Sequence, residues 1–85
     1  MPNDSSPNPD LHSDLTIDAS GLNCPLPILK AKKGLATLAS GQVIKVIATD
    51  PHSERDFQDF ARQTGNTLLQ QWRDGAQITH WLARR

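Results

Sequence analysis

The sequence predicts a two-layer α/β domain with the order β-α-β-α-β-β, in which two helices cover one face of a four-stranded mixed sheet. Apolar residues recur at three- and four-residue spacing over 25–38 and 53–63, a pattern typical of amphipathic helices. Short runs of alternating or β-branched apolar residues predict four strands, over 15–19, 43–49, 67–73 and 76–83. A right-handed crossover makes the first two strands parallel, and the dipeptide Asp74-Gly75 indicates an antiparallel hairpin between the last two.

The N-terminal segment differs in composition from the rest of the chain. Residues 1–14 are rich in Pro, Asn, Ser and Asp, and Leu11 is their one apolar residue apart from Met1. Such a segment cannot bury enough apolar surface to fold, so we expect a disordered tail over 1–14. The remaining residues, 15–85, are enough for one small domain.

The first helix is expected over 25–38. Its buried face should carry the apolar residues Ile28, Ala31, Leu35 and Leu38. The lysines that fall largely off that face are Lys30, Lys32 and Lys33. Gly34 weakens the helix interior by ~1 kcal/mol relative to alanine, so the helix must be held by packing. Gly41 is the expected left-handed cap at its end.

The next two elements are a strand and a second helix. The strand over 43–49 is nearly all apolar, which predicts a central strand that is buried on most of both faces. The second helix is expected to have Ser53 as its N-cap and to be closed by Gly65.

The turn at Asp74-Gly75 sets the register of the expected hairpin. It would pair Leu69 with His80, Gln71 with Ile78 and Trp72 with Gln77. One face of the hairpin then carries the aliphatic residues Leu69, Ile78 and Leu82, and the other carries Leu68, Trp72 and Trp81. We expect the aliphatic face to be the core face.

The only cysteine, Cys24, lies between the first strand and the first helix, in Gly21-Leu22-Asn23-Cys24-Pro25-Leu26-Pro27. Proline is tolerated in the first turn of a helix, so Pro25 and Pro27 place Cys24 at or just before the helix start, where it should be accessible. The partial positive charge of a helix N-terminus favours a thiolate, which predicts a thiol pKa below the usual value of about 8.5. A small buried core residue is the other interpretation of a free cysteine, but it does not suit a turn position. Because loops that follow parallel strands share one edge of a sheet, loop 50–55 is expected on the same side as Cys24.

Composition and charge exclude several classes of protein. A single cysteine excludes an internal disulfide, and the three histidines lack metal-ligand spacing, so no metal and no cofactor are expected. The zero net charge argues against direct nucleic-acid binding. The sequence has no apolar run that could cross a membrane and no signal peptide, and an unpaired cysteine suits a reducing compartment. We therefore expect a cytoplasmic protein with no membrane contact.

The stretch from Asp18 to Pro27 resembles the D-x-x-G-L-x-C-P-x-P signature of the TusA/SirA family of small sulfur-carrier proteins, and the resemblance extends to the end of the chain. It implies that Cys24 is the catalytic residue, a thiolate that accepts sulfane sulfur as a persulfide from a cysteine desulfurase or a rhodanese-like protein. The sulfur would then pass to an acceptor protein of a sulfur relay, so the chain would be a carrier rather than a stand-alone enzyme. Asn23 stands where the best-known members have a basic residue, and Leu26 where an acid is often found. These two departures leave open the donor, the acceptor and the pathway, whether tRNA thiolation or another branch of sulfur metabolism.

The resemblance also assigns roles to the neighbours of the thiol. The supporting residues it implies are Asp18, Gly21, Pro25 and Pro27. Asp18 is expected to be a hydrogen-bonding turn residue, Gly21 to supply a positive φ, and the two prolines to shape the start of the helix. Partner docking is expected at Lys30, Lys32, Lys33 and Arg55, although lysines on a helix are ordinarily a solvated face.

Two other classes of function stay open. The chain could be a non-catalytic regulatory or interaction module in which Cys-Pro-x-Pro is only a helix cap. An RNA-binding module is a further alternative, by analogy with translation-factor domains of similar topology, but that analogy concerns the fold alone and the zero net charge counts against it. A gain of one sulfur on Cys24 in the presence of a donor would select the carrier.

Overall fold

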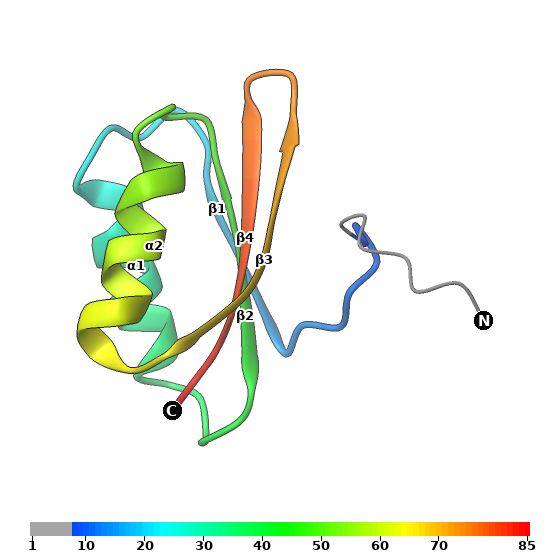
Figure 1. The fold of residues 1–85 in the computed structure, drawn as a ribbon, viewed down its shortest axis with the longest axis vertical. Helices are drawn as coiled ribbons and strands as arrows, with labels where there is room; N and C mark the ends of the chain where they lie inside the picture. Colours follow the sequence, from blue (N-terminus) through cyan, green and yellow to red (C-terminus); the bar gives the residue numbers. More distant parts are fainter. Residues whose placement is uncertain (1–7) are drawn as a thin grey trace.

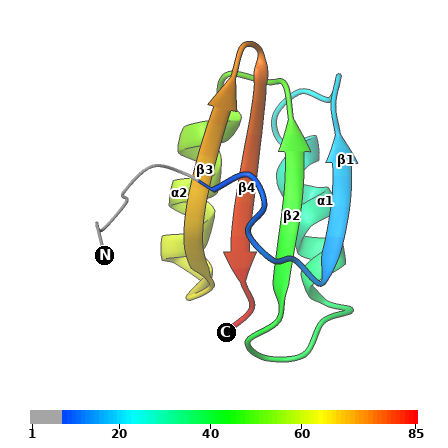
Figure 2. The same ribbon diagram turned by 90° about the vertical axis from the view of Figure 1, so that its right-hand side faces the viewer.

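Two helices lie side by side on one face of a four-stranded sheet (Figure 1). The structure is a computed structural model that describes residues 8–85. Its elements in chain order are β1 (Leu15–Ala19), α1 (Leu26–Leu35), β2 (Val43–Ala48), α2 (Ser53–Thr64), β3 (Thr67–Asp74) and β4 (Gln77–Ala83). The strand order is β1-β2-β4-β3, with β1 parallel to β2 and the other two pairs antiparallel (Figure 2). The predicted fold class, element order and mixed sheet are therefore confirmed.

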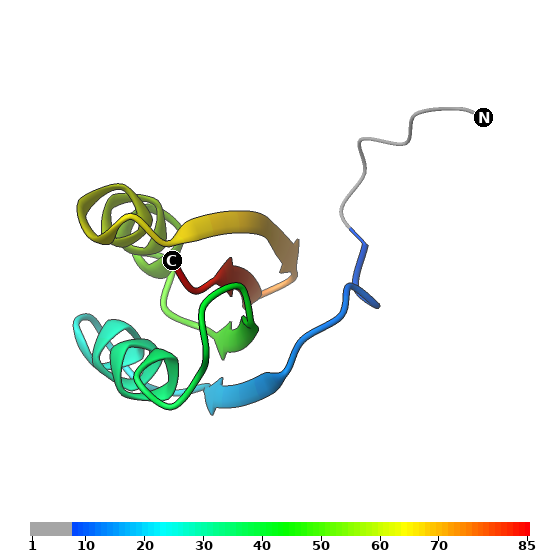
Figure 3. The ribbon, with the colours of Figure 1, turned by 90° about the horizontal axis from the view of Figure 1, so that it is seen from below.

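The core lies between the sheet and the two helices (Figure 3). Its buried side chains come from both layers and include Ala31, Leu35, Ile44, Val46, Phe57, Phe60 and Leu82. Gly34 is buried against the sheet, and a Cβ atom there would lie 2.6 Å from the Cδ1 atoms of both Ile17 and Ile44. Glycine thus lets α1 pack close to β1 and β2, and this packing offsets its weak helix propensity.

Helix α1 is shorter than predicted. It ends at Leu35 rather than Leu38, and its C-cap residue, Ala36, is in the right-handed conformation. The chain continues as a tight turn, in which the backbone N–H and the hydroxyl of Thr37 both donate to the carbonyl of Gly34. Gly41 has a φ of +86°, but it lies in the loop before β2 and is not the helix cap.

Helix α2 begins and ends near the predicted residues, with a different N-cap. The cap position is His52, and the hydroxyl of Ser53 instead lies 3.1 Å from Nε2 of His80 inside the domain. Ser53 is thus an internal hydrogen-bonding residue, because a buried histidine on β4 needs a polar partner. Gly65 closes the helix in the left-handed conformation, with a φ of +80°, as predicted.

Strand β2 is central in the sheet, as predicted, but it is not buried on both faces. Every second residue faces the helices and is buried, namely Ile44, Val46 and Ala48. The intervening residues are half-buried on the other face, because no helix within residues 8–85 covers it.

The β3–β4 hairpin has a different register from the predicted one. Its turn is Gly75-Ala76, and the observed pairs include Asp74 with Gln77, Trp72 with Thr79 and Gln71 with His80. An irregularity between Leu68 and Gln70 leaves Leu69 44% exposed and places Leu68 opposite Leu82 against the core. The predicted pairs were therefore wrong, and so was the placement of Leu69 in the core.

The observed register gives the buried His80 a polar neighbour on β3. The side-chain amide nitrogen of Gln71 lies 3.0 Å from Nδ1 of His80, whereas the predicted register would have set Leu69 opposite this ring. A buried imidazole with no hydrogen-bond partner is destabilising, which favours the observed pairing. Ile78 and Leu82 are fully buried, so that part of the predicted core face is confirmed.

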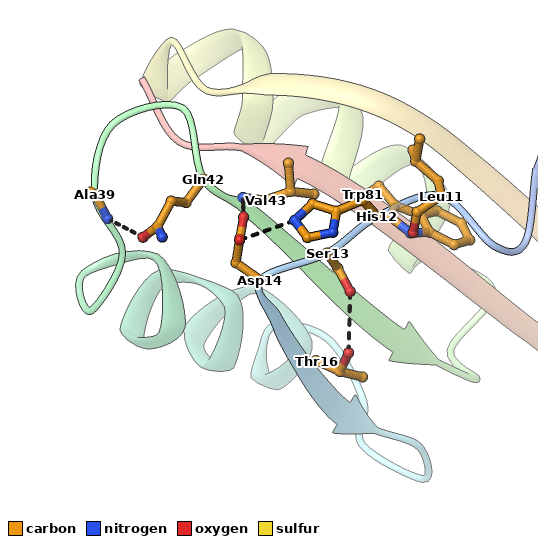
Figure 4. Close-up of polar contacts among 9 residues, drawn as sticks. All are labelled: Leu11, His12, Ser13, Asp14, Thr16, Ala39, Gln42, Val43 and Trp81. Atoms are coloured by element: carbon orange, nitrogen blue, oxygen red, sulfur yellow. Dashed lines mark hydrogen bonds and ion pairs between the residues drawn. The ribbon is translucent and has the colours of Figure 1, made fainter.

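Residues 8–14 lie across the face of the sheet that the helices leave open (Figures 2 and 3). The carbonyl of Leu11 accepts the indole N–H of Trp81 at 3.2 Å, and the carboxylate of Asp14 accepts the backbone N–H of Val43 at 2.8 Å (Figure 4). Trp81 is only 1% exposed, and Nζ of Lys45 lies 5.5 Å from its ring centre. Of the predicted tail, residues 1–7 lie outside the described residues, and residues 8–14 form no helix or strand but contact the sheet.

Candidate functional site

Cys24 lies in the loop between β1 and α1, and its side chain is exposed. Helix α1 begins at Leu26 with Pro25 in the N-cap position, and the Cys24–Pro25 peptide bond is cis. Pro25 is exposed, whereas Pro27, in the first turn, is buried. The thiol is therefore accessible at the start of a helix, as the two prolines predicted.

Short contacts fix the turn that leads to the thiol. The carboxylate of Asp18 accepts the backbone N–H of Ser20 at 2.9 Å, and hydrogen bonding by the side chain and then the backbone of Ser20 lowers the pKa of Asp18. Gly21 has a φ of +80°, and its N–H donates to the hydroxyl of Thr49 at 2.9 Å. Leu22 packs against the core beneath the turn. Asp18 and Gly21 thus determine the path of the chain before the cysteine.

Asp50, two residues after the end of β2, joins this turn to α2. One carboxylate oxygen accepts the backbone N–H of Cys24 at 2.7 Å, and the other accepts the backbone N–H of His52 at 3.0 Å. The hydrogen bonds from His52 and Cys24 lower the pKa of Asp50. They outweigh the opposite effect of burial on this carboxylate, which is only 7% exposed. The expectation that loop 50–55 lies on the same side as Cys24 is confirmed by the contact between Asp50 and Cys24.

The electrostatics of the thiol are opposite to the prediction. The side chain of Asp56 accepts a hydrogen bond from the thiol, and this bond, partial desolvation and the charges of Asp56 and Asp50 raise the thiol pKa. The helix N-terminus contributes a fraction of a positive charge, whereas the two aspartates contribute full negative charges. The predicted lowering of the Cys24 pKa was therefore wrong. Asp50 and Asp56 had no role at the thiol in the sequence analysis, which placed loop 50–55, and not Asp56, at the same edge as Cys24.

Among residues 8–85, no hydrogen bond or ion pair joins the side chains of His52, Arg55 or the three lysines of α1 to Cys24. Nδ1 of His52 is 3.0 Å from Asp50 and forms an ion pair with it when protonated, so this ring belongs to the carboxylate rather than to the thiol. Arg55 is exposed in the first turn of α2. Lys30, Lys32 and Lys33 are all exposed on α1.

The structure divides these three lysines between two sides of α1. Lys30 and Lys33 line a hollow beside β1, whereas Lys32 lines a separate hollow with Phe60 of α2 and Arg84. The three positive charges therefore do not form one patch. Two large apolar side chains, Leu26 and Leu29, are 46% and 52% exposed on the thiol-proximal half of the same helix, and the sequence analysis had not singled them out.

The described part of the chain contains neither a metal-binding cluster nor a membrane-spanning helix. Among residues 8–85, no three side chains of His, Cys, Asp or Glu are grouped so that they could hold a metal ion. No helix in that range is long and apolar enough to span a membrane.

The fold and the site together define a small two-layer α/β protein built around one accessible thiol at a strand-to-helix turn. A family model described as sulfurtransferase TusA matches residues 15–84, and the chain belongs to this family. It is 56% identical over 72 residues to the sulfur carrier protein TusA of Allochromatium vinosum, covering 85% of this chain and 93% of that one. It is 40% identical over 76 residues to the protein of the same name from Pseudomonas putida, covering 89% and 95% of the two chains.

A solved structure gives the same result for the fold. The crystal structure of a SirA-like protein from Desulfitobacterium hafniense superposes with a TM-score of 0.72 at 32% sequence identity. The match covers 81% of this chain and 95% of that chain. The family resemblance seen in the Cys-Pro-x-Pro stretch is therefore confirmed.

Proposed function

We propose that this protein is a sulfur carrier that accepts sulfane sulfur as a persulfide on Cys24 and relays it to an acceptor protein. The observation that carries the proposal is the exposed thiol of Cys24, held at a helix start by the hydrogen bond from its backbone N–H to Asp50. The sulfur-carrier names of the relatives support it. The donor is a cysteine desulfurase or a rhodanese-like protein, and the compartment is a reducing cytoplasm, because Cys24 is a free, exposed thiol.

The proposed transfer is an exchange at sulfur. The Cys24 thiolate attacks the outer, sulfane sulfur of the donor persulfide, a new S–S bond forms on Cys24, and the donor's S–S bond breaks. The bonding electron pair leaves with the donor cysteine as its thiolate, and the thiol proton of Cys24 is lost to solvent or to a base of the donor. No external oxidant or reductant is consumed. Transfer to the acceptor repeats the step in the opposite direction.

The two aspartates beside Cys24, Asp50 and Asp56, disfavour the thiolate in the free protein. Since Asp56 and Asp50 raise the pKa of the thiol, the free carrier holds Cys24 mainly protonated at neutral pH. A cationic group of the docked donor, placed against Asp56, would remove this effect and favour the thiolate. We therefore propose that activation of Cys24 is completed by the partner. Asp18, Gly21, Pro25 and Pro27 shape the turn, and exposed Lys30, Lys32, Lys33 and Arg55 take part in docking.

The test is sulfur loading followed by intact mass. The protein is incubated with a cysteine desulfurase and cysteine, and the expected product carries one additional sulfur that a thiol reductant removes. Cys24→Ser is the control and should gain none. Absence of the added sulfur with both a desulfurase and a rhodanese donor would contradict the carrier and favour the alternative, a non-catalytic interaction module in which Cys-Pro-x-Pro is only a helix cap.

A further inference from the structure

Strand β1 lies at the edge of the sheet. Its one strand neighbour among the described residues is β2, and its other side faces away from the sheet (Figure 2). The backbone N–H and C=O groups on that side are available to pair with a further strand, which is the usual property of an edge strand.

A hollow of about 290 Å³ lies along this same edge, between β1 and α1. Its lining residues are Leu15, Ile17, Lys30, Lys33, Gly34 and Thr37. The floor is apolar, because Leu15 and Ile17 are half-buried there and Gly34 has no side chain to cover them. The rim is cationic, since Lys30 and Lys33 are exposed and neither forms an ion pair within residues 8–85.

We propose that the free edge of β1, together with the hollow beside it, receives an extended segment of a sulfur-relay partner as an added strand. The segment places an apolar side chain over Leu15 and Ile17 and an acidic side chain between Lys30 and Lys33. This inference rests on the proposed function for the identity of the partner. It uses the general mode of β-strand addition, in which backbone hydrogen bonds give affinity and alternate side chains give specificity.

The charge of the rim selects this occupant over a second copy of the chain. A two-fold contact between two β1 edges is self-complementary, so it would set the Lys30 and Lys33 pair of one copy beside the same pair of the other. Like charges placed side by side oppose such a contact, whereas an acidic segment is attracted to it.

The hollow also shares a helix face with the thiol end of α1. Positions 26, 30 and 33 are three or four residues apart, so they follow one side of α1, and the turn after the helix carries Thr37. Exposed Leu26 is at the end of that row next to Cys24, and Thr37 is at the hollow. A partner whose active site covers Cys24 can therefore reach the β1 edge with a neighbouring segment.

The probe for this site is the peptide acetyl-Thr-Val-Thr-Glu-Thr-Val-Thr-amide, titrated into the full chain and followed by NMR. We expect saturable shifts in residues 15–19 and 30–37 and slowed hydrogen exchange at the outward amides of β1. Two matched peptides serve as controls: one has lysine in place of the glutamate, and one is N-methylated at its three central residues. Both should bind at least about tenfold more weakly, because they remove the charge match and the backbone pairing respectively.

Matched protein variants locate the contact. The double variant Lys30→Glu/Lys33→Glu should weaken peptide binding by about tenfold or more, whereas Arg73→Glu, on β3 at the opposite edge of the sheet, should change it by less than about twofold. Equal binding of the glutamate and lysine peptides, shifts confined to other elements, or a dimer that forms through β1 would each overturn the inference. Sulfur loading of Cys24 is scored separately by mass: normal loading without peptide binding refutes the edge site alone, and peptide binding without loading refutes the proposed function alone.

Discussion

His80 should make the stability of the domain fall on mild acidification. Its ring is fully buried on β4 and stacks on Phe57 with a centroid distance of 4.1 Å. Nδ1 faces the amide nitrogen of Gln71, which also donates to the carbonyl of Glu54, so Nδ1 is the acceptor and the ring proton is on Nε2, toward Ser53. A second ring proton would meet the Gln71 donor. Protonation therefore opposes the hydrogen bonds that join β4 to the first turn of α2.

The size of the effect follows from the pKa of the ring. Burial lowers the pKa of His80 from 6.5 to about 4. Because the folded pKa is below the unfolded one, the unfolded state takes up the proton first, so the contribution is present above pH 6.5 and is lost as the pH falls toward 4. The difference corresponds to about 3 kcal/mol in total, of which about 2 kcal/mol is lost between pH 7 and pH 5.

The assay is urea unfolding at pH 7, 6 and 5, followed by tryptophan fluorescence. His80→Gln cannot titrate in this range but can still hydrogen-bond, so its unfolding free energy should change much less over the same interval. The carboxylates whose pKa is lowered, Asp14, Asp18 and Asp50, act at lower pH and do not confuse the result. NMR titration of the His80 ring is an independent measurement. A ring pKa near 6.5, or a wild-type loss below about 0.5 kcal/mol between pH 7 and pH 5, would refute the reasoning.

Two further perturbations test the thiol and the N-terminal segment. Asp56→Asn should lower the pKa of Cys24, because it removes the charge that most disfavours the thiolate. The rate of alkylation as a function of pH measures the thiol pKa, and Asp59→Asn on the same helix is the control. An unchanged thiol pKa in Asp56→Asn would refute the role given to Asp56. Deletion of residues 1–13 should keep the fold but shift tryptophan emission to the red and lower the unfolding free energy by about 1–2 kcal/mol, since Trp81 loses its hydrogen bond to Leu11 and its cover. Deletion of residues 1–7 is the matched control, and identical spectra for the two deletions would mean that residues 8–13 do not cover Trp81.

The architecture could be predicted from the sequence because local patterns agreed with one another. The apolar spacing on α1 and α2, the β-branched run of β2 and the left-handed Gly65 each indicate the same element order. The two prolines that follow Cys24 predicted that the thiol lies at a helix start, where the structure has it. These features depend on residues that are close in sequence.

The features that could not be predicted depend on contacts between distant residues. The observed hairpin register places Gln71 opposite His80, where the two side chains hydrogen-bond. The dipeptide Asp74-Gly75, which predicts a turn, does not indicate that pairing. The N-terminal segment has almost no apolar residues, yet Leu11 lies over Trp81, seventy residues away in the chain. Composition describes how a segment behaves in isolation. It does not reveal that a tryptophan on a distant strand accepts the segment as a packing and hydrogen-bonding partner.

The pKa of the Cys24 thiol also depends on residues that are distant in the sequence, and this pKa affects the proposed mechanism. The sequence near Cys24 contains a helix start, whose partial positive charge favours a thiolate. Asp50 and Asp56 are more than two dozen residues away in the chain, and their full charges outweigh that partial one. A free carrier with this site holds its nucleophile as the less reactive thiol, which limits alkylation and oxidation between transfers. In the mechanism proposed above, reactivity depends on a partner that neutralises the acidic side of the site, so the two carboxylates that raise the thiol pKa would also favour partners with a cationic active-site rim.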